Sequence, residues 1–260
     1  MDILGIAHAD DPLLKAASDD LRAFIGSARV EEDRYARARQ GAGALADYFR
    51  DLIATRRKSP GEDFVSRMIT ARDEAGQLSE DELLATCMLV PFAGHETTTH
   101  LLGNALNALL DHPAQMQQLR QRLRDDPTLS HSAVEEFLRY DGPNLSVARA
   151  VSADHAIAGK RLLAGDRVFA IVSAANRDPR AFDDPQVLDI ARSPNRHLAF
   201  GVGLHFWMGA PLARLEGQRC SARLLPRLDR IERAPGEPSW VDALVMRGVA
   251  SLPIQLGQRG

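Results

Sequence analysis

The sequence predicts a mainly α-helical fold with small β-sheets, on three observations. Apolar residues in the N-terminal third recur at the 3.6-residue period of amphipathic helices. The segment from Leu83 to Leu110 is apolar on most sides, which predicts a long central helix. Shorter segments between 147 and 172 alternate apolar and polar residues, as strands do. The 260 residues, 45% of them hydrophobic, suffice for one large core, so we expect a single domain over residues 1–260.

Composition narrows the class of partner. The net charge of −3 does not indicate a surface for nucleic acid or anionic membranes. The two cysteines, Cys87 and Cys220, lie in separate segments and are typical of reduced thiols. No apolar run reaches transmembrane length, and the N-terminus turns acidic too early for a signal peptide. We therefore expect a cytoplasmic protein with no nucleic-acid or membrane partner.

Three helices are expected in the N-terminal third. Pro12 opens the first, whose apolar face runs to Ile25. A second covers about 31–58 and ends in a basic turn that complements the helix dipole. A third, shorter helix covers about 63–74.

The long central helix has a clear start and an unusual middle. Ser79 and Glu82 form a capping box at its beginning. At 1.5 Å per residue the helix should be on the order of 40 Å long. Pro91 should kink it, and polar residues at 93–99 interrupt its apolar surface. We expect Glu96, within this interruption, to be buried.

The remaining elements are shorter. Helices are expected from Pro113 to Leu123 and from Ser130 to Tyr140, followed by short strands. The later segments are strands at 147–151, 157–162 and 167–172, a helix beginning at Pro211, and a hairpin within 244–256.

The stretch from Phe200 to Glu216 carries the most specific motif in the chain. It resembles the haem-binding loop of the cytochrome P-450 monooxygenases, whose signature is F-G-x-G-x-H-x-C-x-G-x-x-L-A-R-x-E. The matching residues are Phe200, Gly201, Gly203, His205, Gly209, Leu212, Ala213, Arg214 and Glu216. One position differs, because Trp207 stands where the family has the cysteine that ligates iron.

This substitution decides the cofactor expectation. A thiolate ligand donates electron density to iron and favours O–O cleavage, whereas an indole has an N–H donor and no lone pair for a metal. We expect Trp207 to project toward the volume of the porphyrin and to exclude or displace haem. His205 is the alternative iron ligand, although the resemblance gives it a role in the loop. No cofactor is therefore expected, and haem is kept as the alternative.

The interruption of the long helix resembles a second family motif, A-G-x-[DE]-T-[TS]. The resemblance implies that Glu96 and Thr97 are an acid–alcohol pair that relays protons, and His95 is a further acid/base candidate. The alternative is that both side chains satisfy backbone groups released by the kink. The sequence leaves these two interpretations open.

Three further contacts are implied by the resemblance. Glu136 and Arg139 form the family's E-x-x-R, one helical turn apart, and Arg192 completes a structural triad. Arg149 and His197 match contacts to the haem propionates, and either could bind another anion.

The resemblance covers essentially the whole chain but only part of the family's fold. Family members have a further N-terminal portion, so we expect a truncated cytochrome P-450-like fold. The long helix and the helix after Pro211 would then expose apolar faces, which soluble monomers rarely do. We expect a homodimer or a partner protein to cover that side.

Three functions follow from these expectations. The first is a haem-free enzyme of secondary metabolism that binds a hydrophobic isoprenoid or polyketide-type intermediate and catalyses a cyclisation or isomerisation. Phe200, His205 and Trp207 would shape its pocket, with Glu96, Thr97 and His95 as acid/base groups. The second is a non-catalytic activator of a partner such as a glycosyltransferase. The third is a pseudogene-like remnant or a haem protein with residual monooxygenase function.

A metal site is not expected, with one exception. Paired aspartates could hold magnesium if the substrate were a diphosphate. These pairs are Asp10-Asp11, Asp125-Asp126 and Asp183-Asp184. Each pair precedes or adjoins a proline, so duty in loops and helix caps is the competing interpretation.

Overall fold

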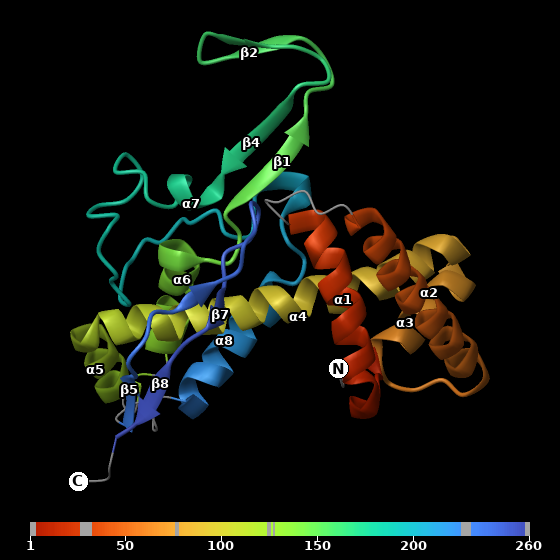
Figure 1. Cartoon of the computed structure of the whole chain (residues 1–260), viewed down its shortest axis with the longest axis horizontal. Coiled ribbons are helices and arrows are strands. Elements are labelled where there is room, and N and C mark those ends of the chain that lie inside the picture. Colours follow the sequence, from red (N-terminus) through yellow and green to blue (C-terminus); the bar gives the residue numbers. More distant parts are fainter. Residues whose placement is uncertain are drawn as a thin grey trace. The chain divides into compact units, whose positions relative to one another are not determined.

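The computed structural model describes residues 4–26, 33–75, 78–123, 126, 128–224 and 230–257. The chain divides into two compact units, Met1–Glu96 and Thr97–Gly260, and each is described by itself. The prediction of a single domain over residues 1–260 is not tested by this division. The expected fold class is confirmed, since helices dominate and the strands form small sheets (Figure 1).

Every regular element described in the first unit is a helix. Their bounds are η2 His8–Asp10, α1 Asp11–Gly26, α2 Arg34–Lys58, α3 Phe64–Ala75 and the beginning of α4 Glu80–Asp111. The part of the predicted second helix before residue 33 lies outside the described residues. Phe49 and Leu45 of α2 and Leu83 of α4 are fully buried in one apolar cluster. At the edge of this cluster the Tyr48 hydroxyl donates to Asp10, at 2.9 Å.

The predicted capping box of α4 is present. The backbone N–H of Ser79 donates to Glu82 Oε2 at 2.7 Å, and the N–H of Glu82 donates to Ser79 Oγ at 3.2 Å. These two bonds satisfy donors that the first turn of a helix leaves without intrahelical partners. The helix then continues through Pro91 for 32 residues in all.

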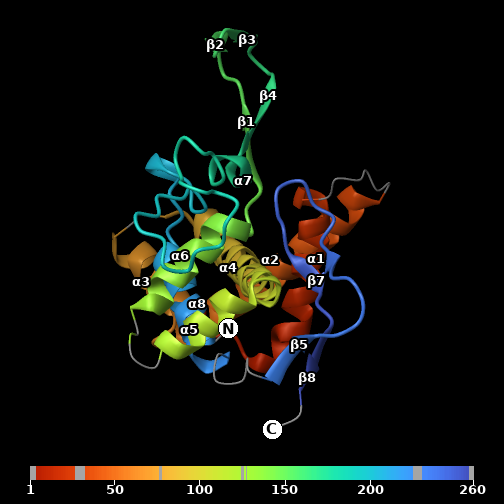
Figure 2. The ribbon, with the colours of Figure 1, turned by 90° about the vertical axis from the view of Figure 1, so that its left-hand side faces the viewer.

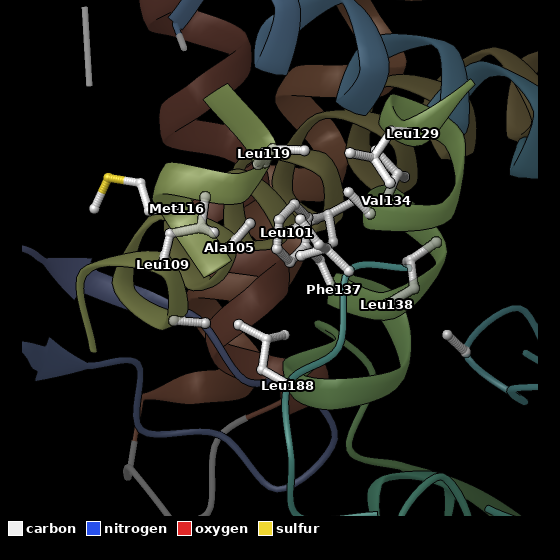
Figure 3. Packing of buried hydrophobic residues seen from close by; sticks show 14 of the residues in the cluster. Leu101, Ala105, Leu109, Met116, Leu119, Leu129, Val134, Phe137, Leu138 and Leu188 are labelled. Atoms are coloured by element: carbon white, nitrogen blue, oxygen red, sulfur yellow. The ribbon is translucent and has the colours of Figure 1, made fainter. Parts of the chain in front are cut away.

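The second unit packs its helices around a larger core. Besides the end of α4, its helices are α5 Pro113–Arg122, α6 Leu129–Asp141, α7 Val172–Ala175, the 3-10 turn η3 Gly203–His205 and α8 Ala210–Leu224. Figure 3 shows Leu101 and Leu109 of α4 lying against Leu119 of α5 and Phe137 of α6. Leu188, from the long irregular segment after α7, closes the same cluster.

The strands pair as antiparallel ribbons. β1 Ser146–Ala150 pairs with β4 Arg167–Ile171, and β2 His155–Ile157 pairs with β3 Lys160–Leu162. The β2–β3 hairpin lies at the far end of the β1–β4 ribbon (Figures 1 and 2). β5 Ile231–Arg233 pairs with β8 Ile254–Leu256, and β6 Ser239–Trp240 pairs with β7 Val249–Ser251.

Buried polar contacts attach the C-terminal strands to α4. The amide of Asn104, fully buried, donates to the carbonyls of Asp141 and Arg247 at 2.9 and 3.1 Å and accepts from the N–H of Val249 at 3.1 Å. The ring of His100, one turn earlier, lies so close to Gly248 that a Cβ there would be 2.0 Å from Nδ1. A glycine is therefore needed at this position. Within the described part of the chain, none of the helices combines the length and apolar character needed to cross a bilayer.

Candidate functional site

The centre of the second unit is a fully buried carboxylate, Glu136 of α6. Arg139, one turn further along the helix, donates to both its oxygens at 2.8 Å, and Arg192 Nε donates at 3.2 Å. The two arginine side chains are 0% and 10% exposed. The structure thus brings the three residues of the predicted triad together. Such a pairing inside a core is stable only when further hydrogen bonds satisfy the charged groups.

Those further bonds tie α6 to the irregular segment that follows α7. Arg139 donates to three backbone carbonyls, those of Asn176, Pro185 and Val187, at 2.8 to 3.0 Å. The Asn195 amide donates to Glu136 Oε2 at 3.1 Å. The triad therefore fixes the backbone that leads into the Phe200–Glu216 motif.

The neighbouring carboxylate, Glu135, anchors the motif itself. Arg214 of α8 donates from Nε to Oε1 at 2.6 Å and from a terminal nitrogen to Oε2 at 2.9 Å. His197 Nε2 lies 3.0 Å from Oε2. Burial alone would raise the pKa of Glu135, but the hydrogen bonds from His197 and Arg214 and the positive charge of Arg214 outweigh it and lower the pKa to about 2. Glu135 was not predicted from the sequence. The only feature that could have indicated it is its position directly before Glu136, the first residue of the E-x-x-R motif.

The two ring nitrogens of His197 both contact groups of the protein. Its side chain is 3% exposed, one ring nitrogen meets the carboxylate of Glu135, and the other, Nδ1, accepts the N–H of Ala199 at 3.2 Å. Both ring nitrogens thus have partners within the protein, and whether His197 contacts a propionate or another anion stays a prediction. Arg149 differs, since its side chain is exposed on β1 and donates to the carbonyl of Ala148 at 2.8 Å.

The loop from Phe200 to Gly209 closes on itself. The N–H of Trp207 donates to the carbonyl of Phe200 at 2.9 Å. Gly201 and Gly203 adopt positive φ angles of 72° and 69°, a region that favours glycine. The Phe200 ring is buried beneath the guanidinium of Arg214, with 4.7 Å between the Arg214 Cζ and the ring centroid. The backbone of Trp207 is thereby connected, through Phe200, to α8 and α6.

Trp207 is half-buried and packs against the apolar cluster of the second unit. A Cβ on Gly209 would lie 2.6 Å from its indole nitrogen, so the ring occupies the space that a larger residue there would need. Whether the indole faces the volume of a porphyrin stays a prediction. His205 and its neighbours on the loop are exposed to solvent.

Large apolar side chains cover the outer side of this loop and the first turns of α8. We call this region the loop–helix surface, and its exposed members are Val202, Leu204, Phe206, Met208, Leu212 and Leu215. Leu204 is fully exposed. Exposure of apolar residues on the helix after Pro211 was expected, whereas the equally exposed loop was not.

The predicted acid/base residues lie on α4, where one unit ends and the other begins. Glu96 and Thr97 are both half-buried, so the expectation that Glu96 is buried was wrong. The side chain of His95 lies outside the described residues. Whether these residues act as acid/base groups stays a prediction.

Within the described ranges, no three or more His, Cys, Asp or Glu side chains are grouped so that they could hold a metal ion. Asp126 accepts the N–H of Thr128 at 2.9 Å, and the carbonyls of Asp183 and Asp184 accept from Arg192. These contacts are loop-forming ones. Asp125 lies outside the described residues.

Comparisons with known proteins identify the family to which this fold belongs. The cytochrome P-450 family profile matches residues 20–230. A polyketide-biosynthesis cytochrome P-450 of Bacillus subtilis, PksS, is 41% identical over 84% of this chain and 54% of its own length. The chain thus spans little more than half of that relative.

Solved structures give the same result. A cytochrome P-450 in complex with an acyl carrier protein ligated to hexadec-9Z-enoic acid is 36% identical, with a TM-score of 0.89 over 98% of this chain and 64% of that one. CxnD, a cytochrome P-450 for C–S bond formation in chuangxinmycin biosynthesis, is 40% identical, with a TM-score of 0.88 over 99% of this chain and 62% of that one. By the extent of the profile match and the shared fold, this chain belongs to the cytochrome P-450 family.

Proposed function

We propose that the chain is a haem-free member of its family that binds a hydrophobic intermediate of the isoprenoid or polyketide type. In this proposal it catalyses a redox-neutral step of secondary metabolism, such as a cyclisation or an isomerisation, in the cytoplasm. The observation that carries the proposal is Trp207, an indole at the position where the family signature has its cysteine. Names of relatives that act in polyketide and chuangxinmycin biosynthesis support the class of substrate.

The side chains of the loop do not fit a thiolate-ligated haem. Neither described cysteine lies in it, since Cys87 is buried in α4 and Cys220 belongs to α8. The Trp207 indole offers no lone pair for iron, and it already packs against the core and Gly209. His205 is the one imidazole between Phe200 and Gly209, and it is exposed, two residues from the ligand position. No haem step therefore enters the proposed reaction.

Acid/base chemistry replaces redox chemistry in this proposal. Glu96 would take a proton from the substrate and return it at another carbon, assisted by Thr97 and His95, so that no electrons are exchanged. The face of the Trp207 ring would stabilise a developing cation. Exposed Arg149 would bind an anionic group of the substrate, and magnesium would be needed only if that group were a diphosphate.

The absence of haem is tested by the absorption spectrum and iron content of protein purified without added haem, followed by titration with haemin. We expect no Soret band in the parent protein. Trp207→Cys should gain a haemin-dependent band with the ferrous–CO absorption of a thiolate complex, and Trp207→Phe, the matched control, should not. Stoichiometric porphyrin in the parent protein would overturn the proposal and favour a residual monooxygenase.

The catalytic part is tested by incubating the chain in deuterated water with a panel of polyketide and isoprenoid intermediates. Product formation with solvent deuterium incorporated is expected. Glu96→Gln should lower the rate at least about 100-fold, the usual contribution of a general acid or base. Asp81→Asn, an exposed acid on the same helix, is the control and should keep the parent rate.

A second candidate is an auxiliary protein that activates a partner enzyme, such as a glycosyltransferase. The observation that favours it is the loop–helix surface, because soluble monomers rarely expose so many large apolar side chains together. A partner protein or a second copy of the chain would cover this surface. Activity that appears only when a second protein is added would favour this role over catalysis, and light scattering would distinguish a homodimer from a monomer.

A further inference from the structure

We propose that Glu135 and His197 form a proton-sensitive clamp on the loop that carries Trp207, and that protonation of His197 opens the clamp. We call the three linked groups, Glu135, His197 and the N–H of Ala199, the loop clamp. It lies entirely within the second unit, and it does not depend on the proposed reaction or on haem.

The hydrogen bonds define the protonation state of the closed clamp. Nδ1 of His197 accepts the N–H of Ala199 at 3.2 Å, so it carries no proton in this arrangement. The remaining nitrogen, Nε2, faces a carboxylate oxygen of Glu135 at 3.0 Å and must therefore be the protonated one. A second proton on the ring would sit on Nδ1, facing the N–H of Ala199. Two donors would then oppose each other and this bond would be lost.

Loss of that bond acts directly on the loop. Ala199 is buried and immediately precedes Phe200, whose carbonyl holds the N–H of Trp207 at 2.9 Å. The carbonyl of Ala199 accepts from the Asn144 amide at 3.1 Å, and this bond does not involve His197. Protonation of His197 would therefore break only the hydrogen bond of the Ala199 N–H. A change at His197 therefore reaches the backbone of Trp207 in two steps.

The charged groups around His197 act on its protonation in opposite directions. The Glu135 carboxylate of α6 stabilises the protonated ring, and Arg214 of α8 opposes it by binding the same carboxylate. Glu136, the next acid on α6, forms ion pairs with Arg139 and Arg192 instead of contacting His197. Arg196, on the same segment as His197, has an exposed side chain. The imidazole is thus the group of the clamp in which an added proton would break a hydrogen bond, the one between Nδ1 and the N–H of Ala199.

Hydrogen exchange of the full-length chain tests the clamp. Protection of peptides spanning residues 198–209 is followed from about pH 8 to about pH 5, the range in which an imidazole titrates, with correction for intrinsic exchange. We expect exchange in this segment to rise at least tenfold as pH falls, while peptides of 101–109 in the core helix stay protected. His197→Gln keeps an amide near Glu135 but cannot titrate, so its exchange should not vary with pH.

His131→Gln is the matched control. His131 lies on α6, as Glu135 does, and contacts Gln218 of α8, but it is not part of the clamp. It should keep the pH dependence of the parent. Emission of Trp207 in a Trp240→Phe background gives a second readout, and Glu135→Gln should shift its midpoint to lower pH. The clamp is refuted if His197→Gln keeps the parent's pH dependence, or if the loop loses protection only together with the core helix.

Discussion

Two adjacent carboxylates on α6 hold the same part of the molecule in different ways. Glu136 is surrounded by two arginines and an amide, groups that keep their charge state at any pH a protein survives. Glu135 shares its oxygens between one arginine and one histidine. The first network therefore fixes the backbone permanently, whereas the second, in the clamp proposed above, fixes the loop beyond it only while His197 is neutral.

The largest effect should come from breaking the permanent network. Glu136→Ala leaves Arg139 buried without its carboxylate, and removing one partner of a buried pair costs about 3–5 kcal/mol. The free energy of unfolding in urea measures this loss. If this loss changes between about pH 8 and about pH 5, the range in which an imidazole titrates, the distinction between the two networks is wrong.

Acid should reveal the second network. The pKa of Glu135 falls from 4.5 to about 2 on folding, so its stabilising contribution is fully present above pH 4.5 and is lost as pH falls toward about 2. This shift corresponds to about 3 kcal/mol at about 1.4 kcal/mol per pKa unit. Urea midpoints measured across this range should fall more steeply for the parent than for Glu135→Gln. Identical slopes would mean that Glu135 titrates alike in both states.

A smaller change should sharpen the comparison at the far end of the loop. Gly209→Ala would place a Cβ 2.6 Å from the Trp207 indole nitrogen, so the ring must move, at a cost of about 1–3 kcal/mol. The emission of Trp207 should shift with it. Gly43→Ala in α2 is the control, because no heavy atom lies within 4 Å of its added Cβ, and it should stabilise the chain by about 0.4–1 kcal/mol. An unchanged emission in Gly209→Ala would contradict the packing described for Trp207.

The smallest effect is expected on the outside of the same loop. Leu204→Ser removes a fully exposed side chain, so the free energy of unfolding should change by less than about 0.5 kcal/mol. If the loop–helix surface is covered by a partner or a second copy, the same variant should weaken that association in light scattering or pull-down. A large loss of stability would instead show that Leu204 packs inside the chain.

Much of this organisation could be predicted from the sequence. Periodicity located the helices, the capping box of Ser79 and Glu82 located the start of α4, and the spacing of Glu136 and Arg139 predicted their pairing. These features are local, so one helical turn is enough to specify them. The contacts of Glu135 and His197 were missed because they join residues 62 positions apart, and nothing in either neighbourhood marks them as partners.

Half-burial of Glu96 could not be predicted for a related reason. An apolar helix predicts that polar residues in its middle are enclosed, but the enclosure depends on elements that the helix itself does not encode. The packing of Trp207 is a similar case, since the signature predicts where the indole stands in the chain and not which neighbours receive it.

The contact between Gly248 and His100 has a practical meaning for anyone who redesigns the C-terminal hairpin. A single methyl group at Gly248 would have to displace the imidazole of His100 on the long helix. Asn104, on the same helix, also forms hydrogen bonds to Arg247 and Val249, the two residues that flank Gly248. Loop grafts and randomised libraries between β6 and β7 can therefore vary the length and charge of the other positions, but they should keep glycine at position 248.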